Sequence, residues 1–465
     1  MNYDQSVKYL LSLGRELASP QQASAAKFDL QNITVLTKRM GRPYTFYPTV
    51  HIAGTNGKGS TAAMLAAILR AAGLRTGLYT SPHLLRINER MRIDDADISD
   101  AAFAQVFTRV HEVIEELLAA GTLAAHPTYF ECVTAMAFQF FAQEKAEFAV
   151  IEVGMGGRLD STNVITPEVA VITAIDFDHE NFLGHAIEQI AAEKAGIIKP
   201  NAWVVNAAGR PEASEVIRRR AAEQNARVIE PESAYRISQL REEQGFYRFV
   251  AAPRDAASGA DGGIGEIEVR LPLAGRFQVR NALTALATAR CLAQRGFRID
   301  DAAIARGLAE VRWPGRLERM MESPIVYIDG THNPSGAREL VAFWRDTFAG
   351  RRIHLVYGTL RDKAVDEVAG LLFPHAATVI LTQSRQPRSL SAETLAEMTG
   401  HLASSLEIVP DPAVALQRAI ERAAPEDVVF ATGSLYLVGE FRRYWQSRAA
   451  APTAEAHPPV GSGSR

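Results

Sequence analysis

The chain has 465 residues, of which 47% are hydrophobic and 22% charged, a composition typical of two or three globular domains rather than a disordered chain. A formal net charge of −3 lacks the basic excess of proteins that coat nucleic acid. Cys132 and Cys291 are too few for a disulfide framework and lack the spacing of a zinc site. Because no signal-like N-terminus or membrane-spanning apolar stretch is visible, we expect a soluble, cytoplasmic protein that binds neither nucleic acid nor membrane.

The first half of the chain predicts an α/β domain with a parallel sheet. A β-prone run at 50–53 enters a Gly-rich turn, after which apolar residues recur at helical spacing from Met64 to Leu69. A second run at 77–80 completes a βαβ unit. Near-continuous apolar runs at 148–153 and 169–173 are typical of parallel strands covered on both faces.

The segment that follows predicts a small antiparallel appendage and then a linker. Residues 247–250 and 267–270 alternate between apolar and polar, and the Gly- and Asp-rich stretch between them predicts an exposed loop. A helix is expected from about Asn281 to Gln294, followed by an irregular Pro- and Gly-containing segment at 311–316. This segment reads as a linker between domains.

Beyond the linker, strand and helix patterns alternate again. Strands are expected at 325–328, 353–357, 378–382 and 427–431, which predicts a smaller Rossmann-like domain. The Pro-, Gly- and Ser-rich C-terminus has little to bury and predicts disorder. The expected division is a larger α/β domain at 1–310, a linker at 311–318, a Rossmann-like domain at 319–446 and a disordered tail at 447–465.

The turn after the first strand predicts a nucleotide phosphate site, because backbone N–H groups at a helix start bind phosphate oxygens. It departs from the usual P-loop spacing: Ile52 stands at the position of the first Gly, and Gly59 replaces the hydroxyl residue after Lys58. The residues of this loop are Gly54, Thr55, Asn56, Gly57, Lys58, Gly59, Ser60 and Thr61.

Polar residues near three strand ends suggest a metal site. Ser81, Glu152 and His179 follow or end separate strands, whose carboxyl ends face one crevice in a parallel sheet. A hard divalent ion beside phosphates accepts such ligands. On local sequence alone, His179 also fits a loop histidine and Ser81 a turn residue. The nearby Gly154, Gly156 and Gly157 are not a dinucleotide fingerprint, because Leu159 takes the third Gly position.

The phosphate loop closely resembles that of the Mur ligase superfamily, and specifically of folylpolyglutamate synthases and dihydrofolate synthases. The resemblance continues, in family order, through Thr80-Ser81-Pro82-His83-Leu84, Asn88-Glu89-Arg90, Tyr129-Phe130-Glu131, residues 152–160, Asp178-His179, Glu193-Lys194-Ala195-Gly196-Ile197, Asp329-Gly330-Thr331-His332-Asn333-Pro334 and Gly433-Ser434-Leu435-Tyr436. It implies a monomeric ATP- and Mg²⁺-dependent ligase that joins L-glutamate to a folate or to dihydropteroate through an acyl phosphate.

The resemblance also assigns roles to single residues. It implies that Ser81, Glu152 and His179 bind Mg²⁺, and that Lys194 is carbamylated by CO₂, although its place at a helix end also fits a solvated lysine. Lys58, Lys194 and His332 are the expected catalytic residues.

Three further residues are expected at the nucleotide. By the resemblance, Arg316 reaches the ATP phosphates and Asn281 contacts ATP, although Asn281 also fits a helix N-cap. Asp329 follows a predicted strand, from which its carboxylate can accept ribose hydroxyls; its alternative role is a helix cap.

Folate contacts are implied for two segments, Asp29, Leu30 and Gln31, and Thr128, Tyr129 and Phe130, where an aromatic ring can stack on a pterin.

Two alternative functions remain: a Mur-type ligase acting on a peptidoglycan precursor, and a nucleotide-binding kinase or switch without ligation. Dependence on glutamate distinguishes a ligase from a kinase or switch.

Overall fold

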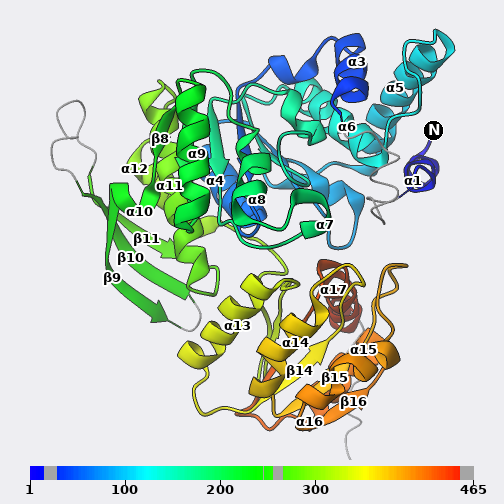
Figure 1. Cartoon of the computed structure of the whole chain (residues 1–465), viewed down its shortest axis with the longest axis vertical. Helices are drawn as coiled ribbons and strands as arrows, with labels where there is room; N and C mark the ends of the chain where they lie inside the picture. Colours follow the sequence, from blue (N-terminus) through cyan, green and yellow to red (C-terminus); the bar gives the residue numbers. More distant parts are fainter. Residues whose placement is uncertain (15–28, 244–245, 255–264, 451–465) are drawn as a thin grey trace, which may run out of the picture.

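The computed structural model describes residues 1–14, 29–243, 246–254 and 265–450, which form two α/β domains joined by an irregular segment after Glu310 (Figure 1). A parallel sheet behind a phosphate loop, an antiparallel appendage and a smaller Rossmann-like domain are all present. The predicted fold class is therefore confirmed.

The N-terminal domain is built on a sheet with strand order β4-β3-β2-β5-β1-β6-β7-β8. Strands β2 and β5 to β8 run parallel to β1, whereas β3 pairs in antiparallel fashion with both of its neighbours, β2 and β4. Because β5 lies between β1 and β2, the predicted βαβ unit crosses over one intervening strand. The strands are β1 (Thr49–Ala53), β2 (Thr76–Tyr79), β3 (Met91–Ile93), β4 (Ala96–Asp97), β5 (Phe148–Glu152), β6 (Val169–Ile172), β7 (Trp203–Asn206) and β8 (Arg227–Ile229).

Helices cover both faces of this sheet, since alternate strand residues point to opposite sides. Val50 and Ile52 pack with α4, α11 and α12, whereas Ile151 packs with α5 and α6, and Ile172 with α8 and α9. The helices are α1 (Tyr3–Ser12), α3 (Gln31–Arg39), α4 (Lys58–Ala71), α5 (Asp100–Ala119), α6 (Tyr129–Gln143), α7 (Glu180–Leu183), α8 (Ile187–Ala195), α9 (Pro211–Glu223), α10 (Pro231–Ala234), α11 (Phe277–Gln294) and α12 (Asp301–Glu310).

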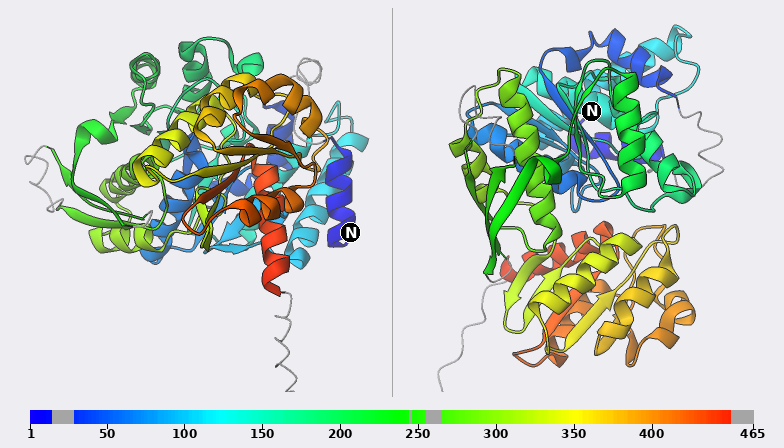
Figure 2. Two further views of the ribbon diagram at one scale, coloured as in Figure 1. Left: turned by 90° about the horizontal axis from the view of Figure 1, so that it is seen from below. Right: turned by 60° about the vertical axis from the view of Figure 1, so that its left-hand side comes forward.

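The appendage is an antiparallel sheet of β9 (Tyr235–Glu243), β10 (Phe246–Pro253) and β11 (Ile267–Leu271). It extends from the first domain toward the second (Figure 2), where the Thr347 hydroxyl donates to Glu242 at 2.9 Å. Most of the predicted exposed loop, residues 255–264, lies outside the described residues.

The C-terminal sheet has strand order β12-β13-β17-β14-β15-β16, parallel except for β12. Helices α13 to α15 pack on one face, and α16 and α17 on the other. The elements are β12 (Glu318–Glu322), β13 (Ile325–Ile328), α13 (Pro334–Thr347), β14 (Ile353–Tyr357), α14 (Val365–Leu372), β15 (Thr378–Leu381), α15 (Ala392–Thr399), β16 (Leu406–Ile408), α16 (Pro412–Arg422), β17 (Val428–Thr432) and α17 (Leu435–Ala450).

The last helix extends beyond the predicted start of the tail. α17 continues to Ala450, so residues 447–450 are helical and not part of a disordered tail; the remainder of that prediction, residues 451–465, lies outside the described residues. None of the helices in the described part of the chain is long and apolar enough to cross a membrane.

Candidate active site

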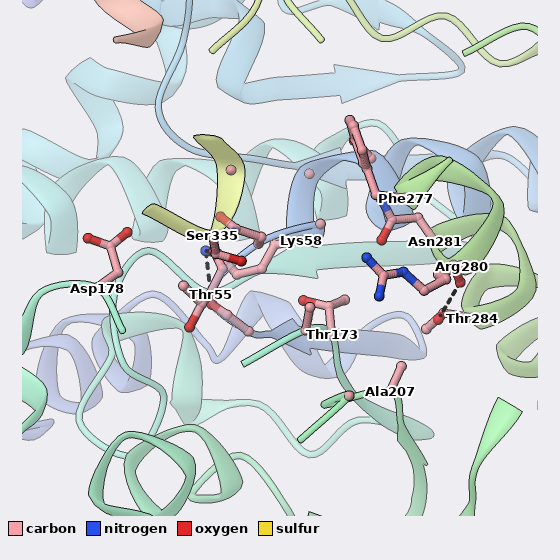
Figure 3. A pocket seen from close by; sticks show the side chains of 18 of the residues that line it. Thr55, Lys58, Thr173, Asp178, Ala207, Phe277, Arg280, Asn281, Thr284 and Ser335 are labelled. Atoms are coloured by element: carbon pink, nitrogen blue, oxygen red, sulfur yellow. Dashed lines mark hydrogen bonds between the residues drawn. The ribbon is translucent and has the colours of Figure 1, made fainter. Parts of the chain in front are cut away.

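A cavity of about 500 Å³ lies between the two domains, where the carboxyl ends of the N-terminal strands meet the β13–α13 loop (Figure 3). Figure 3 shows Lys58 from α4 and Asn281 from α11 at this cavity. The structure therefore brings together most of the residues predicted to bind ATP or metal. Those in the cavity wall are Gly54 to Ser60, Ser81, Glu152, His179, Lys194, Asn281, Arg316, Asp329 and His332.

The phosphate loop is held by the loop that follows β6. The Thr55 and Asn56 N–H groups both donate to the Ala174 carbonyl oxygen, at 2.8 and 3.2 Å. The Lys58 ammonium donates to the carbonyl oxygens of Gly54 and Thr55, at 3.1 and 3.2 Å, and so lies over the loop. This fixed turn at the start of α4 is the geometry that binds phosphate oxygens.

Two glycines are required by this turn. Gly57 has φ +88°, and a Cβ there would lie 2.4 Å from the Asn281 Oδ1. Gly54 has φ +153°, and its Cβ would lie 1.8 Å from the Thr173 Oγ1. Any side chain would therefore both strain the backbone and clash with neighbouring elements.

The departure from the usual P-loop spacing at Gly59 has a structural reason. A Cβ on Gly59 would meet the Trp313 ring at 3.0 Å, so the interdomain segment packs directly on the start of α4. Thr61, in contrast, is buried within α4 and is not part of the cavity wall, because it lies a full helical turn beyond Gly57.

Ser81, Glu152 and His179, predicted from their places at strand ends, all line this cavity. The Ser81 N–H donates to the Glu152 Oε2 at 3.0 Å. Burial raises the pKa of Glu152, against the opposing effects of Lys58 and the Ser81 N–H. Burial also lowers the pKa of His179 to about 4, so its imidazole is neutral at pH 7. Among the described residues, no three or more His, Cys, Asp or Glu side chains lie grouped so that they could hold a metal ion. The proposed ligands contain only two such side chains, Glu152 and His179, because the third is Ser81.

Lys194 is not the solvated lysine that its local sequence suggests. Only 4% of it is exposed, and its Nζ donates to the Gly54 carbonyl oxygen at 2.9 Å. Burial, reinforced by the nearby Lys58, lowers the pKa of Lys194 to about 7. A substantial neutral fraction therefore exists at neutral pH, which gives this amine nucleophilic character.

Arg316 and Asp329 come from the interdomain segment and from the end of β13. Arg316 is partly buried and donates to the carbonyl oxygen of its neighbour Gly315 at 3.0 Å. Desolvation lowers the pKa of Arg316, and the nearby Asp329 and Glu152 carboxylates oppose this shift. The Asp329 carboxylate accepts the Leu317 and Thr331 N–H groups, both at 2.9 Å. Asp329 therefore ties the interdomain segment to the turn after β13, whereas the cap of α13 is Asn333.

Asn281 is not a helix N-cap. Helix α11 begins at Phe277, four residues earlier than the sequence suggests, so Asn281 lies inside the helix and faces Gly57. Its side-chain amide donates to Gln278 at 2.9 Å.

The two predicted folate segments lie together but outside the wall of this cavity. Asp29 precedes α3 and accepts the Gln31 N–H at 2.8 Å, while Thr128 caps α6. Leu30, Tyr129 and Phe130 all belong to the same apolar cluster. Phe130 also contacts the cavity wall, because a Cβ on Gly154 would lie 2.4 Å from its ring.

The sequence analysis missed a polar cluster that links the domains. Asp178 pairs with Lys363 at 2.9 Å and accepts from the Asn333 amide at 3.2 Å. His332, whose Nδ1 lies 2.8 Å from the Gly330 carbonyl oxygen, has its Nε2 3.6 Å from Asp178. The available signal was the position of Asp178 beside His179.

Comparison with known proteins agrees with this geometry. Residues 52–289 match the Mur ligase middle domain, and residues 315–435 match the Mur ligase, glutamate ligase domain. The chain is 35% identical over 454 residues to the folylpolyglutamate synthase of Lacticaseibacillus casei, covering 95% of this chain and 98% of that protein. It is 34% identical over 410 residues to the dihydrofolate synthase/folylpolyglutamate synthase of Bacillus subtilis, covering 88% and 93%.

A solved structure is also similar. The E. coli FolC protein in complex with DHPP and ADP superposes with a TM-score of 0.82 at 29% identity, covering 96% of this chain and 98% of that one. The chain spans about half, 51%, of a longer relative from Haloferax volcanii named as a probable bifunctional folylpolyglutamate synthase/dihydropteroate synthase. The chain belongs to the folylpolyglutamate synthase and dihydrofolate synthase family of the Mur ligase superfamily.

Proposed function

We propose that this chain uses ATP to phosphorylate the carboxylate of a folate-type acceptor, and that the amine of L-glutamate then displaces the phosphate. Family membership makes the chain an ATP-dependent carboxylate–amine ligase. In the first step a carboxylate oxygen attacks the γ-phosphorus and ADP leaves; in the second the amine attacks the acyl carbon, phosphate leaves and the nitrogen loses a proton. The observation that carries the proposal is the interdomain cavity with a phosphate loop, the buried Glu152 carboxylate and the partly buried Arg316 in its wall.

In this reaction the chain's own residues bind the nucleotide and stabilise charge. Lys58 and the loop amides hold the β- and γ-phosphates, and Arg316 stabilises charge on the transferred phosphoryl group. Asn281 and Asp329 contact the rest of ATP, with His332 near the nucleotide. The position of all five in one cavity wall supports these roles.

The donor set fits Mg²⁺. A buried carboxylate, a neutral imidazole and a hydroxyl are contributed by Glu152, His179 and Ser81, and all three line the cavity near Lys58. When bound there, Mg²⁺ would neutralise charge on the ATP phosphates.

The variants Glu152→Gln and His179→Ala are expected to raise the Mg²⁺ concentration needed for half-maximal activity by at least about 10-fold, because each removes a proposed ligand. Titration of Mg²⁺ at saturating ATP measures the change. Glu193→Gln is the matched control, since Glu193 pairs with Arg158 outside the cavity wall. Titration curves of both variants that overlay the parent curve would show that the metal site is misplaced.

We infer that Lys194 acts as a carbamate. The neutral amine attacks the carbon of CO₂, an N–C bond forms, one C=O electron pair moves to oxygen and a proton leaves to solvent. The product is a carboxylate beside the phosphate loop, which can orient a metal ion or its waters. Burial of Lys194 and its lowered pKa support this inference.

The acceptor is proposed to bind along α3 and α6. Residues Asp29 to Gln31 and Thr128 to Phe130 contact the pterin, and the contact between Phe130 and Gly154 connects this region to the cavity. Both dihydropteroate and folylglutamates are candidate acceptors.

One assay tests the function. Purified protein with ATP and Mg²⁺ is given dihydropteroate, a tetrahydrofolylglutamate or, for comparison, a nucleotide-linked peptidoglycan precursor with its amino acid. The two folate-type acceptors are tested with and without L-glutamate, and ADP, phosphate and ligated product are measured. We expect ADP, phosphate and product in equal amounts when all substrates are present. Turnover that ignores glutamate would indicate a kinase or switch, and turnover only with a nucleotide-linked peptidoglycan precursor would indicate a Mur-type ligase; either result contradicts the proposal. The preferred acceptor of the pair follows from the same data.

A further inference from the structure

The loop that follows β6, residues 174–179, is bonded to the phosphate loop on one side and to the C-terminal domain on the other. At Asp176 two hydrogen bonds, both made by the Thr55 hydroxyl, join this loop to the phosphate loop. The Thr55 hydroxyl donates to the Asp176 carbonyl oxygen at 2.9 Å and accepts the Asp176 N–H at 3.1 Å. The backbone of Asp176 therefore moves with the phosphate loop.

The carboxylate of Asp176 is shared by arginines from both domains. Its Oδ1 accepts from Arg210, which precedes α9, at 2.8 Å, and its Oδ2 accepts from Arg338 of α13 at 3.2 Å. Arg338 is half-exposed, at 48%, and also pairs with Glu367 of its own domain at 3.4 Å. Asp176 itself is largely shielded, at 13% exposed, so its pair with Arg338 is less screened than two fully exposed charges would be.

A second interdomain pair starts two residues further along. Asp178 bonds to Lys363, and the two side chains are 11% and 9% exposed. The side-chain amides of Asn56 and Asn333 bond to each other in both directions, at 3.3 and 3.0 Å. Asn56, Asp178 and Asn333 line the cavity, whereas neither Asp176 nor Arg338 does. An effect of Arg338 on the reaction is therefore expected to pass through the position of the domains, whereas Asp176 also bonds to Arg210, which lines the cavity.

We propose that Asp176 is a positioning residue that, through Arg338, keeps the C-terminal domain against the phosphate loop while the acyl phosphate exists. This inference rests on the proposed ligation. If the cleft opens early, water attacks the acyl carbon, the bond to the phosphate oxygen breaks, and carboxylate and phosphate are released without ligation. The pair of Asp176 and Arg338 thus favours reaction of the acyl phosphate with glutamate over its hydrolysis.

The test compares Asp176→Asn, Arg338→Gln, the double variant and Glu367→Gln as the matched control, which removes the other partner of Arg338 but leaves the interdomain pair. The full-length protein is supplied with ATP, Mg²⁺, glutamate and the acceptor that the parent uses, and phosphate and ligated product are measured. We expect about one phosphate per product for the parent and for Glu367→Gln, and a several-fold higher ratio for both single variants. The double variant should resemble Asp176→Asn, because that variant already lacks the pair with Arg338; Asp176→Asn also weakens the pair with Arg210, so its ratio can exceed that of Arg338→Gln.

Several results would overturn the inference. A ratio of one in Arg338→Gln, an equal rise in Glu367→Gln, or additive effects in the double variant would each show that the interdomain pair does not protect the intermediate. Thermal melts separate these results from misfolding, and Arg338→Gln alone tests the proposal if Asp176→Asn is unstable. A parent that forms no glutamate-dependent product contradicts the proposed function and this role together, whereas tight coupling in parent and variants contradicts this role alone.

Discussion

Replacement of Lys58 by alanine is expected to lower kcat/KM for ATP by about 100-fold or more, corresponding to about 3 kcal/mol of transition-state stabilisation. Lys58 is the cation of the phosphate loop, and its ammonium lies over that loop on the carbonyl oxygens of Gly54 and Thr55. The developing negative charge on the transferred phosphoryl group loses this partner. Loss of the ammonium also makes ionisation of Glu152 less favourable, since Lys58 lowers the pKa of that buried carboxyl.

The fold should tolerate this change. The Lys58 ammonium bonds to carbonyl oxygens in the cavity wall, so removing it leaves groups that water can reach. Steady-state kinetics measure the loss of catalysis, and a thermal melt measures any loss of stability. We expect the melting temperature to stay close to the parent value. Lys58→Met, which keeps most of the apolar side chain, should lose as much activity as Lys58→Ala. Near-full activity in either variant would remove the loop from the mechanism.

Local sequence predicts the phosphate loop well because every part of its signal is adjacent. A buried strand, a Gly-rich turn and a helix follow one another between Thr49 and Ala71, and the structure has them in that order. The presence of Ser81, Glu152 and His179 in one cavity wall could also be predicted, because the carboxyl ends of parallel strands share one edge of the sheet.

Features set by contacts between distant segments could not be predicted in this way. Lys194 is buried because α8 packs its last turn against Gly54, 140 residues earlier in the chain, and nothing in its neighbouring sequence indicates that contact. The pair of Asp178 and Lys363 depends on how the two domains meet. Strands β7 and β16 were not predicted from the sequence.

Lys194→Ala is expected to lose on the order of 100-fold in activity, because the proposed carbamate orients groups at the reacting phosphate and small misplacements there cost that much. The parent amine, with its pKa lowered to about 7, is mostly protonated below that pH and cannot attack CO₂. The parent should therefore lose activity in CO₂-free buffer at pH 6 and recover it when bicarbonate is supplied at pH 8.

Chemical rescue and a charge-preserving variant separate a carbamate from an ammonium ion. Short carboxylic acids fit the space that Lys194→Ala leaves and should restore part of its activity, whereas amines of similar size should not. Lys194→Arg keeps the positive charge but cannot form this carbamate, so it should be as inactive as the alanine variant. A ¹³C NMR carbamate signal from protein equilibrated with labelled bicarbonate should be present in the parent and absent from both variants. An arginine variant as active as the parent would show instead that the buried Lys194 acts as a cation, held on the Gly54 carbonyl oxygen to brace the phosphate loop.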